Sequence, residues 1–308
     1  MNASAMPPID TMAEAIYAAH CATFSEGPPA ASPTGFTSDE PVHRAAKQAC
    51  AQLGFIDIDA ECLAMAWQAQ TVRLGGFDAA AWPSTAIDFG LAPWPRSQGF
   101  AACPRQLGLY AVLPDAAWVA RMAKAGVPTL QLRYKSTDAD AIRREVDAAV
   151  AAVRGTASLL FINDHWQAAI DAGAYGVHLG QEDLDALAPE QLAVLRASGV
   201  RLGISTHGYA EMLRADAVSP SYIAMGAVFP TTLKRMATAP QGLARLNAYA
   251  RLLRGHSLVA IGGIDAERMP AVLQSGVGSV AVVRAITGAA DPEAAALALQ
   301  DVLRSHLI

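Results

Sequence analysis

Several features that mark common classes of protein are missing from this sequence. Its four cysteines, Cys21, Cys50, Cys62 and Cys103, show no CxxC spacing, so neither a zinc site nor a redox site is expected from them. No apolar run approaches the roughly 18 residues that span a bilayer, and the N-terminus lacks a basic region followed by an apolar stretch. We therefore expect a cytoplasmic protein without a membrane partner.

Charge is scarce as well, because charged residues make up 17% of the 308 residues and the net charge is -5. No basic stripe is present, so nucleic acid is not an expected partner. No GxGxxG or GxxxxGKS loop follows any apolar run of strand length, which argues against the usual dinucleotide and P-loop sites. The length predicts one large domain with an extension, or two domains, and leaves open whether the protein is a homo-oligomer.

The first 104 residues are predicted to form an N-terminal extension of mainly helical and irregular structure. The stretch around residues 25–41 is rich in Pro, Ser and Gly and is predicted to be flexible. Helices are predicted over residues 43–53 and 59–74, the second with Asp59 as its N-cap and a glycine pair after its end. Four aromatic residues interleaved with prolines then predict a packed segment or, as the alternative, an aromatic ligand surface. They are Trp82, Phe89, Trp94 and Phe100.

From residue 105 to residue 308, short apolar runs alternate with longer amphipathic stretches in eight pairs. The runs are GLYAVL, TLQLRYK, SLLFIND, YGVHLG, RLGIST, YIAMGAVF, LVAIGGI and SVAVVRAI. Helical segments between them begin with Asp and end with Gly, for example those from Asp115 and Asp265. Repeated strand–helix units require a parallel sheet with right-handed crossovers. We therefore predict an α/β fold of the (β/α)8 TIM barrel type, with an open doubly wound sheet as the alternative.

Polar residues occupy one face of the second predicted strand. Side chains alternate across a strand, so Gln131, Arg133 and Lys135 are predicted to share the interior face of the barrel. Barrel interiors are normally apolar, so these groups need buried or bound partners. An anionic ligand is the favoured partner, and pairing with core carboxylates is the alternative.

Two acidic residues follow neighbouring strands at the end of the barrel where active sites lie. The third strand ends in Asn163-Asp164, and Asp183 follows the fourth strand about one strand–helix unit later. Each aspartate alone could simply cap a helix. Together they predict a site for one hard cation, because Mg2+ is usually held by one or two carboxylates and by substrate phosphates.

The later strands carry residues suited to binding phosphate. The seventh strand is predicted to end in Gly262-Gly263, and the eighth is predicted to carry Arg284 near its end. The loops after these two strands commonly bind phosphate in barrels, through backbone N–H groups. The PTTLK segment after the sixth strand adds Thr231, Thr232 and Lys234, although a proline-threonine turn is the alternative there. Two anion-binding regions around one metal site indicate two phosphorylated small-molecule substrates.

The histidines do not decide the chemistry. His178 lies within the fourth strand and is expected to be a core or supporting residue, while His165 is expected to be a local helix cap. His207 follows GIST at the active end and is a candidate for proton transfer. No Ser-His-Asp or Cys-His arrangement can be assembled from the sequence.

Taken in order, the segments QLRYK, IND, VHLGQEDL, GISTH, GAVFPTTLK, AIGGI and VAVVRAI resemble the thiamine-phosphate synthase family over about residues 106–287. The resemblance implies a (β/α)8 barrel that joins hydroxymethylpyrimidine diphosphate to a thiazole phosphate with release of pyrophosphate. It implies that Mg2+ is bound by Asp164 and Asp183, and that Arg133, Lys135, Ser205 and Lys234 assist the departure of pyrophosphate. The substrate-binding residues that it implies are Gln131, Arg133, Lys135, Asn163, Ser205, Thr231, Thr232, Lys234, Gly263, Val283 and Arg284.

This sequence departs from the family pattern at two positions, both in the implied thiazole phosphate pocket. Leu233 stands where the family usually has threonine, and Arg284 stands where it has serine. Two other interpretations remain as alternatives: a barrel enzyme similar to the thiazole tautomerases, which needs neither metal nor diphosphate site, and a non-catalytic sensor of thiamine precursors. The retained polar residues favour the synthase over both.

Overall fold

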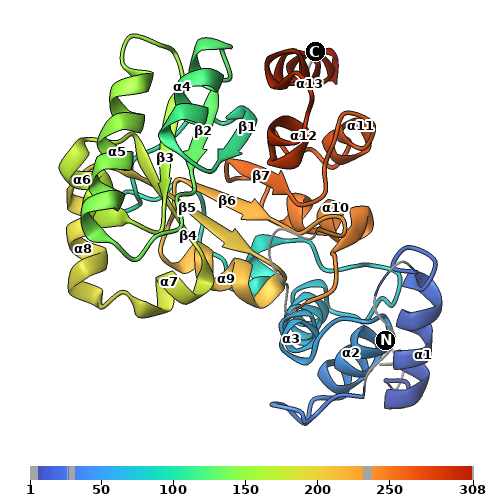
Figure 1. Ribbon diagram of the computed structural model, residues 1–308. Helices are drawn as coiled ribbons and strands as arrows, with labels where there is room; N and C mark the ends of the chain where they lie inside the picture. Colours follow the sequence, from blue (N-terminus) through green and yellow to red (C-terminus); the bar gives the residue numbers. More distant parts are fainter. Residues whose placement is uncertain (1–5, 26, 28–31, 232–237, 307–308) are drawn as a thin grey trace.

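The computed structural model describes residues 6–25, 27, 32–231 and 238–306. Eight parallel strands follow one another in chain order around a closed barrel (Figure 1). The barrel closes where Tyr110 of the first strand pairs with Ala281 of the last, so the (β/α)8 prediction is confirmed and the open sheet is excluded. The strands are β1 (Gly108–Leu113), β2 (Thr129–Leu132), β3 (Leu159–Asn163), β4 (Gly176–Leu179), β5 (Arg201–Thr206), β6 (Tyr222–Met225), β7 (Leu258–Ile261) and β8 (Ser279–Val282).

Helices connect successive strands or, as α12 and α13, follow the last strand, and they cover the outside of the barrel. They are α4 (Ala116–Lys124), α5 (Ala139–Val153), α6 (Trp166–Ala172), α7 (Gln181–Ala186), α8 (Pro189–Ala197), α9 (Tyr209–Ala217), α10 (Gly242–Leu252), α11 (Met269–Leu273), α12 (Arg284–Thr287) and α13 (Pro292–His306). Within the described ranges, no helix combines the length and the apolar character that a membrane crossing demands.

The predicted helix starts are right in one case and wrong in another. Asp115 is the N-cap of α4, and its carboxylate accepts a hydrogen bond from Trp118 N, as predicted. The helix predicted from Asp265 is wrong at its start, because α11 begins at Met269. Asp265 lies in the turn before it, where its Oδ1 accepts from Arg268 N and its carbonyl accepts from Met269 N. Pro270 explains the delay, since proline has no N–H to donate inside a longer helix.

Aromatic side chains fill the inside of the barrel. Tyr110, Phe161 and Tyr222 are fully buried and pack edge to face or stacked, with ring centroids 5.1 to 5.9 Å apart. Glycines on β4 and β5 make room for them, because a β-carbon at Gly176 would overlap Phe161 and one at Gly203 would overlap Tyr222. The interior is therefore a filled core, and ligands are left to the ends of the strands.

In its described residues, the extension contains four helical elements, α1 (Ile9–His20), α2 (Pro41–Gln52), α3 (Asp57–Leu74) and the 3-10 helix η1 (Ala86–Phe89). The two predicted helices are confirmed with starts two residues earlier, and α3 ends at a left-handed Gly75 as expected. The first helix was not predicted. In the stretch around residues 25–41, the described residues before Pro41 form no helix or strand.

The aromatic residues of the extension are packed, as predicted. Trp82 lies among other aromatic rings and donates a hydrogen bond from Nε1 to the hydroxyl of Tyr209 on α9 at 3.1 Å. Phe89 stacks on Tyr209, and Trp94 stacks on His256. In Figure 1 the extension, blue to cyan, lies beside α9 and α10.

The last part of the extension crosses the amino-terminal end of the barrel. Arg96 pairs with the buried Asp216 at 2.5 Å, and the hydroxyl of Ser221 donates to Ala101 O at 2.6 Å. The hydroxyl of Ser257 donates to Pro104 O at 3.2 Å. These bonds join both sides of the proposed boundary, and the division after residue 104 stays a prediction.

The predicted role of Asp59 as the N-cap of its own helix is wrong. The N-cap of α3 is Ile56, and Asp59 lies inside the first turn, where its Oδ1 accepts a hydrogen bond from Ala210 N of α9 at 2.9 Å. Asp59 is only 5% exposed, and this burial raises its pKa to about 6 from an ordinary 3.8. The folded protein therefore binds this proton more tightly than the unfolded chain does.

This raised pKa predicts how the stability of the variant Asp59→Asn depends on pH. Between pH 4 and 6 the unfolded chain loses the Asp59 proton before the folded protein does, so this group lowers the stability of the wild type as pH rises. The free energy of unfolding of Asp59→Asn, relative to wild type, should therefore increase by about 3 kcal/mol over this interval and stay constant above it. Urea denaturation from pH 4 to pH 8 measures the difference, and a pH-independent difference would contradict the prediction.

Candidate active site

The candidate site lies where β3 and β4 end, at the carboxyl-terminal end of the barrel. Asp164 directly follows β3 and has a left-handed backbone with φ of 65°, a conformation uncommon outside glycine and asparagine-like residues. Its N–H donates to His178 O of β4 at 3.0 Å, which ties the turn to the neighbouring strand. Asp183 lies in the first turn of α7, and its Oδ2 accepts from Gly180 N at 3.1 Å.

The structure brings the two predicted metal-binding carboxylates together. Burial, and then the negative charge of Asp164, raise the pKa of Asp183. Lys135 Nζ lies 2.5 Å from Asp164 Oδ2, so a cation already faces this pair. Two close carboxylates are mutually repulsive, and a bound divalent cation would relieve this repulsion.

Arg133 and Lys135 lie in a different place from the one predicted. β2 ends at Leu132, so the two cations are in the loop after the strand and not inside the barrel. The last backbone hydrogen bond between β1 and the chain after β2 runs from Arg133 N to Leu113 O at 2.7 Å. It is the last because β1 ends at Leu113 and offers no further partner. Gln131, by contrast, is buried in the interior as predicted.

The partners of Arg133 and Lys135 also differ from the core carboxylates that the alternative interpretation required. Lys135 has the carboxylate partner that the alternative interpretation required, but its side chain is 56% exposed, so the pair is not part of the core. The guanidinium of Arg133 forms no hydrogen bond or ion pair with any residue in the described part of the chain. An exposed lysine and a half-buried arginine beside a carboxylate pair are available to an anionic ligand.

A chain of buried hydrogen bonds crosses the barrel from β2 to β5. Gln131 Nε2 donates to the hydroxyl of Tyr110 at 3.1 Å, and the hydroxyls of Tyr110 and Tyr222 are 2.8 Å apart. Tyr222 Oη lies 2.6 Å from His178 Nδ1, and His178 Nε2 lies 2.7 Å from Ser205 Oγ. The chain therefore joins two predicted substrate-binding residues, Gln131 and Ser205, through three side chains.

Only the first hydrogen bond of this chain has a fixed direction, because the amide nitrogen of Gln131 donates to the Tyr110 hydroxyl. Burial raises the pKa of Tyr110 and Tyr222 far above the working range, so both hydroxyls keep their protons. Tyr110 can accept a second hydrogen bond or donate its own, so either tyrosine hydroxyl can be the donor between them, and His178 can carry its proton on Nδ1 or on Nε2. In the tautomer with the proton on Nε2, His178 donates to Ser205 Oγ and leaves the Ser205 hydroxyl hydrogen for a ligand.

Removing the middle hydroxyl should be costly. The variant Tyr222→Phe leaves buried polar atoms of Tyr110 and His178 without this partner, and each loss of this kind costs about 1–3 kcal/mol. We expect its free energy of unfolding in urea to fall by at least about 1 kcal/mol at neutral pH. Tyr17→Phe is the matched control, because Tyr17 is 41% exposed on α1. Equal stabilities of the two variants would show that the chain adds nothing to the fold.

The loops after β5 and β6 carry other predicted residues. Ser205 is half-buried at the end of β5, and its carbonyl accepts a hydrogen bond from Gln181 Nε2 at 2.7 Å. Thr231 is described and half-buried after β6. Thr232, Leu233 and Lys234 lie outside the described residues.

The predicted phosphate-binding loops after β7 and β8 are partly different from expectation. Gly262 and Gly263 have positive φ of 107° and 65°, and a β-carbon at Gly263 would lie 2.7 Å from Pro230 O in the loop after β6. Arg284 was predicted near the end of the eighth strand, which is wrong: β8 ends at Val282, Val283 is the N-cap of α12, and Arg284 is its exposed first residue.

The histidines take supporting positions. His165 is at the N-cap position of α6 but its side chain does not cap the helix, and its Nε2 lies 3.0 Å from Tyr134 O. His207 follows β5, and its Nδ1 lies 2.7 Å from Glu211 Oε2. Although burial opposes the effect, this contact holds the pKa of Glu211 below its ordinary value. A role for His207 in proton transfer stays a prediction.

Sequence reasoning missed three residues that hold the site together. Tyr110 and Tyr222 lie in apolar runs, where a tyrosine is indistinguishable from other large core residues. Nothing in the sequence assigns Gln181 a role beyond its place in the GQEDL segment. In the structure its side-chain amide donates to Ser205 O and so joins α7 to the end of β5. Side chains alternate between the two faces of a strand, and this alternation could have placed Tyr110 of GLYAVL inside the barrel.

Comparisons with known proteins agree with this geometry. A family model described as thiamine monophosphate synthase matches residues 109–286. The thiamine-phosphate synthase of Neisseria meningitidis serogroup B is 56% identical over 194 residues, which are 63% of this chain and 93% of that protein. That of Serratia proteamaculans is 50% identical over 204 residues, which are 66% of this chain and 95% of that protein.

A solved structure, the thiamine phosphate pyrophosphorylase from Pyrococcus furiosus, superposes with a TM-score of 0.58 and 27% identity. The match covers 66% of this chain and 99% of that one. The extension lies outside the segment that the family model matches. The model covers more than half of the chain and the relatives are matched over nearly their whole length, so the chain belongs to the thiamine monophosphate synthase family.

Proposed function

We propose that the protein is a magnesium-dependent thiamine-phosphate synthase, which joins hydroxymethylpyrimidine diphosphate to hydroxyethylthiazole phosphate. The observation that carries this proposal is the meeting of Asp164 and Asp183 beside Lys135 at the carboxyl-terminal end of the barrel. The names of the relatives support the same reaction. Both substrates are phosphorylated and do not cross membranes unaided, so the proposal includes a cytoplasmic location.

The residues present fit Mg2+ better than a softer metal. In the described ranges, no group of three or more His, Cys, Asp or Glu side chains could hold a metal ion by itself. Two carboxylates suit Mg2+, which usually takes its remaining oxygen ligands from substrate phosphates and water. Asp164 and Asp183 would hold the ion, and the ion would neutralise charge on the diphosphate.

In the proposed reaction the bond between the pyrimidine methylene carbon and the diphosphate oxygen breaks, and the electron pair leaves with pyrophosphate. The methylene carbon then bonds to the thiazole nitrogen. Arg133 and Lys135 would stabilise the growing negative charge of the leaving group, and Lys234 would add a third cation. Gln131 and Ser205, joined by the buried hydrogen-bond chain, would orient the diphosphate substrate, since positioning contributes much of the rate in such reactions.

The thiazole phosphate is proposed to bind near the loops after β6, β7 and β8. Thr231, Thr232, Gly263 and Val283 are the proposed contacts from these loops. Arg284, exposed at the start of α12, is proposed to replace the serine of the family pattern with a fork that can donate two hydrogen bonds.

One assay tests the function. Purified full-length protein is incubated with both substrates, with and without Mg2+, and thiamine phosphate and pyrophosphate are measured by chromatography and by a coupled phosphate assay. The expected result is equal amounts of both products, formed only with the divalent cation. A thiazole isomer formed from a single substrate without metal would instead indicate a tautomerase, and binding of either precursor without turnover would indicate a sensor.

A further inference from the structure

The N-terminal extension contacts the two barrel helices that directly follow proposed substrate loops. Its helix α3 packs against α9, which follows the strand β5 that carries Ser205 near its end. The extension also meets α10, which begins at Gly242 after the loop that carries Thr231. The extension is therefore adjacent to the β5 and β6 loops of the active site (Figure 1).

The connection between β5 and α9 is very short. Thr206 is the last residue of β5, and only His207 and Gly208 separate it from Tyr209, the first residue of α9. A shift in the start of α9 would therefore move the end of β5, where Ser205 lies. The contacts between the extension and this helix start bear directly on the proposed diphosphate site.

Asp59 of the extension occupies the place of a missing helix cap. The N-cap of α9 is Gly208, which has no side chain to accept a hydrogen bond from the first turn. Asp59 Oδ1 accepts instead from Ala210 N at 2.9 Å, and Ala210 is the second helical residue, a usual partner of an N-cap side chain. The carboxylate also places negative charge at the positive end of the helix dipole.

Steric contacts explain why position 208 is glycine. A β-carbon at Gly208 would overlap the carboxylate of Asp59. The backbone there is extended, with φ of 177° and ψ of -174°, and other residues can adopt this conformation. The carboxylate of Asp59 is therefore the obstacle to a side chain at position 208, and it supplies the hydrogen bond that such a side chain would have made.

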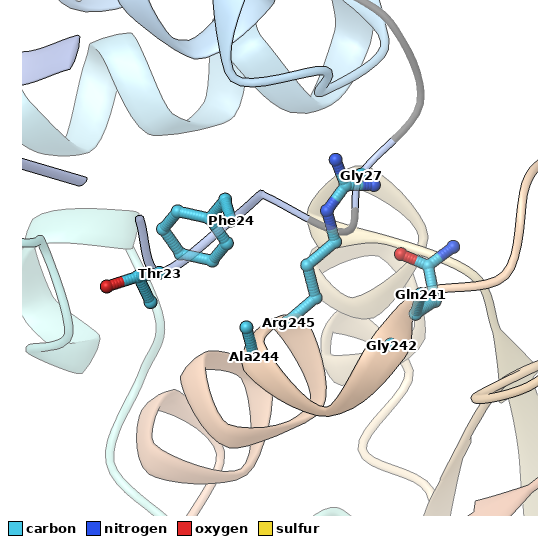
Figure 2. A pocket seen from close by; sticks show the side chains of 7 residues that line it. All are labelled: Thr23, Phe24, Gly27, Gln241, Gly242, Ala244 and Arg245. Atoms are coloured by element: carbon cyan, nitrogen blue, oxygen red, sulfur yellow. The ribbon is translucent and has the colours of Figure 1, made fainter. Parts of the chain in front are cut away.

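A second contact fixes α10 to the extension. Arg245 Nη2 donates to Gly54 O at 2.8 Å, and its guanidinium carbon lies 4.3 Å from the ring centre of Phe55. Figure 2 shows the Arg245 side chain extending from α10 past Phe24 toward Gly27. Arg245 is only 5% exposed, so this contact is a buried part of the interface.

We propose that the extension positions the β5 loop for the diphosphate substrate, with Asp59 as a positioning residue that caps α9 from outside the barrel. This inference rests on the proposed function, since it assigns the β5 loop to diphosphate binding. Relatives such as the synthase of Neisseria meningitidis are matched over 93% of their length by 63% of this chain, so the extension is an addition to the matched part.

Four full-length proteins test the proposal: wild type, Asp59→Ala, Gly208→Ser and the double variant. Asp59→Ala should raise the KM for the diphosphate substrate about tenfold through loss of the cap, with little change for the thiazole phosphate. Gly208→Ser alone should also raise this KM, because its side chain meets Asp59. In the double variant the serine has room to cap α9 itself, so the KM should return to within about threefold of wild type.

A matched control separates positioning from general damage to the extension. Asp57 lies on the same helix but binds Thr34 and Lys47, away from α9. Asp57→Ala should lower the melting temperature and leave the KM for the diphosphate substrate unchanged. Equal KM values for Asp57→Ala and Asp59→Ala, or a double variant no better than Asp59→Ala, would overturn the proposal.

Amide hydrogen exchange gives a readout that needs no substrate. Exchange at Ala210 should be faster in Asp59→Ala than in wild type and should slow again in the double variant. If wild type forms no thiamine phosphate, the proposed function fails, and the exchange rates still decide whether Asp59 caps α9. Unchanged exchange at Ala210 in Asp59→Ala would overturn the capping itself.

Discussion

Replacing Asp183 by alanine should lower the rate of thiamine phosphate formation at least about 100-fold, because a metal ion contributes several kcal/mol and each 1.36 kcal/mol is a factor of about ten. Asp164→Ala should have a similar effect and would also remove the partner of Lys135. Asp164 lies in the turn after β3 and Asp183 lies in the first turn of α7, so neither change should unfold the barrel. Initial rates of pyrophosphate release, measured over a range of Mg2+ concentrations, check this prediction.

Two further variants separate charge from structure. Asp183→Asn keeps an oxygen that can accept from Gly180 N but lacks the negative charge, so it should be nearly as inactive as Asp183→Ala while keeping wild-type stability. Asp185→Ala is the control on the same helix, since this exposed carboxylate pairs with Arg214 at 3.0 Å. Full activity of the wild type in excess chelator would rule out the metal site.

The variant Arg133→Ala should lower kcat/KM for the diphosphate substrate about 100-fold, the loss typical of removing one donor that stabilises charge in the transition state. The KM for the thiazole phosphate should stay within about threefold of wild type, since the guanidinium is assigned to the other substrate. Arg133→Lys should recover only part of the loss, because a lysine cannot donate two parallel hydrogen bonds to a phosphate. Kinetics with each substrate varied separately measure both values.

Arg143→Ala is the matched control for Arg133→Ala. Arg143 lies on α5, and its 67% exposed side chain pairs only weakly with Asp140 at 3.5 Å. Such a surface pair contributes little, so this variant should behave like the wild type. A change confined to the thiazole phosphate parameters in Arg133→Ala would show that the two half-sites are reversed.

The barrel could be predicted from the sequence because each strand is a short apolar run between amphipathic helices. Alternation also placed Gln131 correctly inside. It failed for Arg133 and Lys135, since the alternating pattern continues past Leu132 while the partner strand β1 ends at Leu113. The length of a strand depends on its neighbour, and one stretch of sequence does not contain that information.

The contacts between the extension and the barrel could not be predicted for a related reason. Asp59 at the start of an amphipathic segment has the pattern of an N-cap, and nothing nearby in the sequence points to Ala210. The first helix does carry a signal, because Met12, Ala13 and Ile16 are buried with helical spacing. Pro7 and Pro8 directly precede this helix, and a proline pair is more typical of a turn or an irregular segment than of a helix.

The contacts of the extension also bear on biosynthesis. The hydrogen bond between Trp82 and Tyr209 joins residues 127 positions apart in the sequence, and the one between Asp59 and Ala210 joins residues 151 positions apart. At the usual pace of translation, Tyr209 is added on the order of 10 s after Trp82. During that interval the apolar side of the extension that later meets α9 has no partner, so the nascent chain is expected to depend on chaperones until α9 and α10 leave the ribosome.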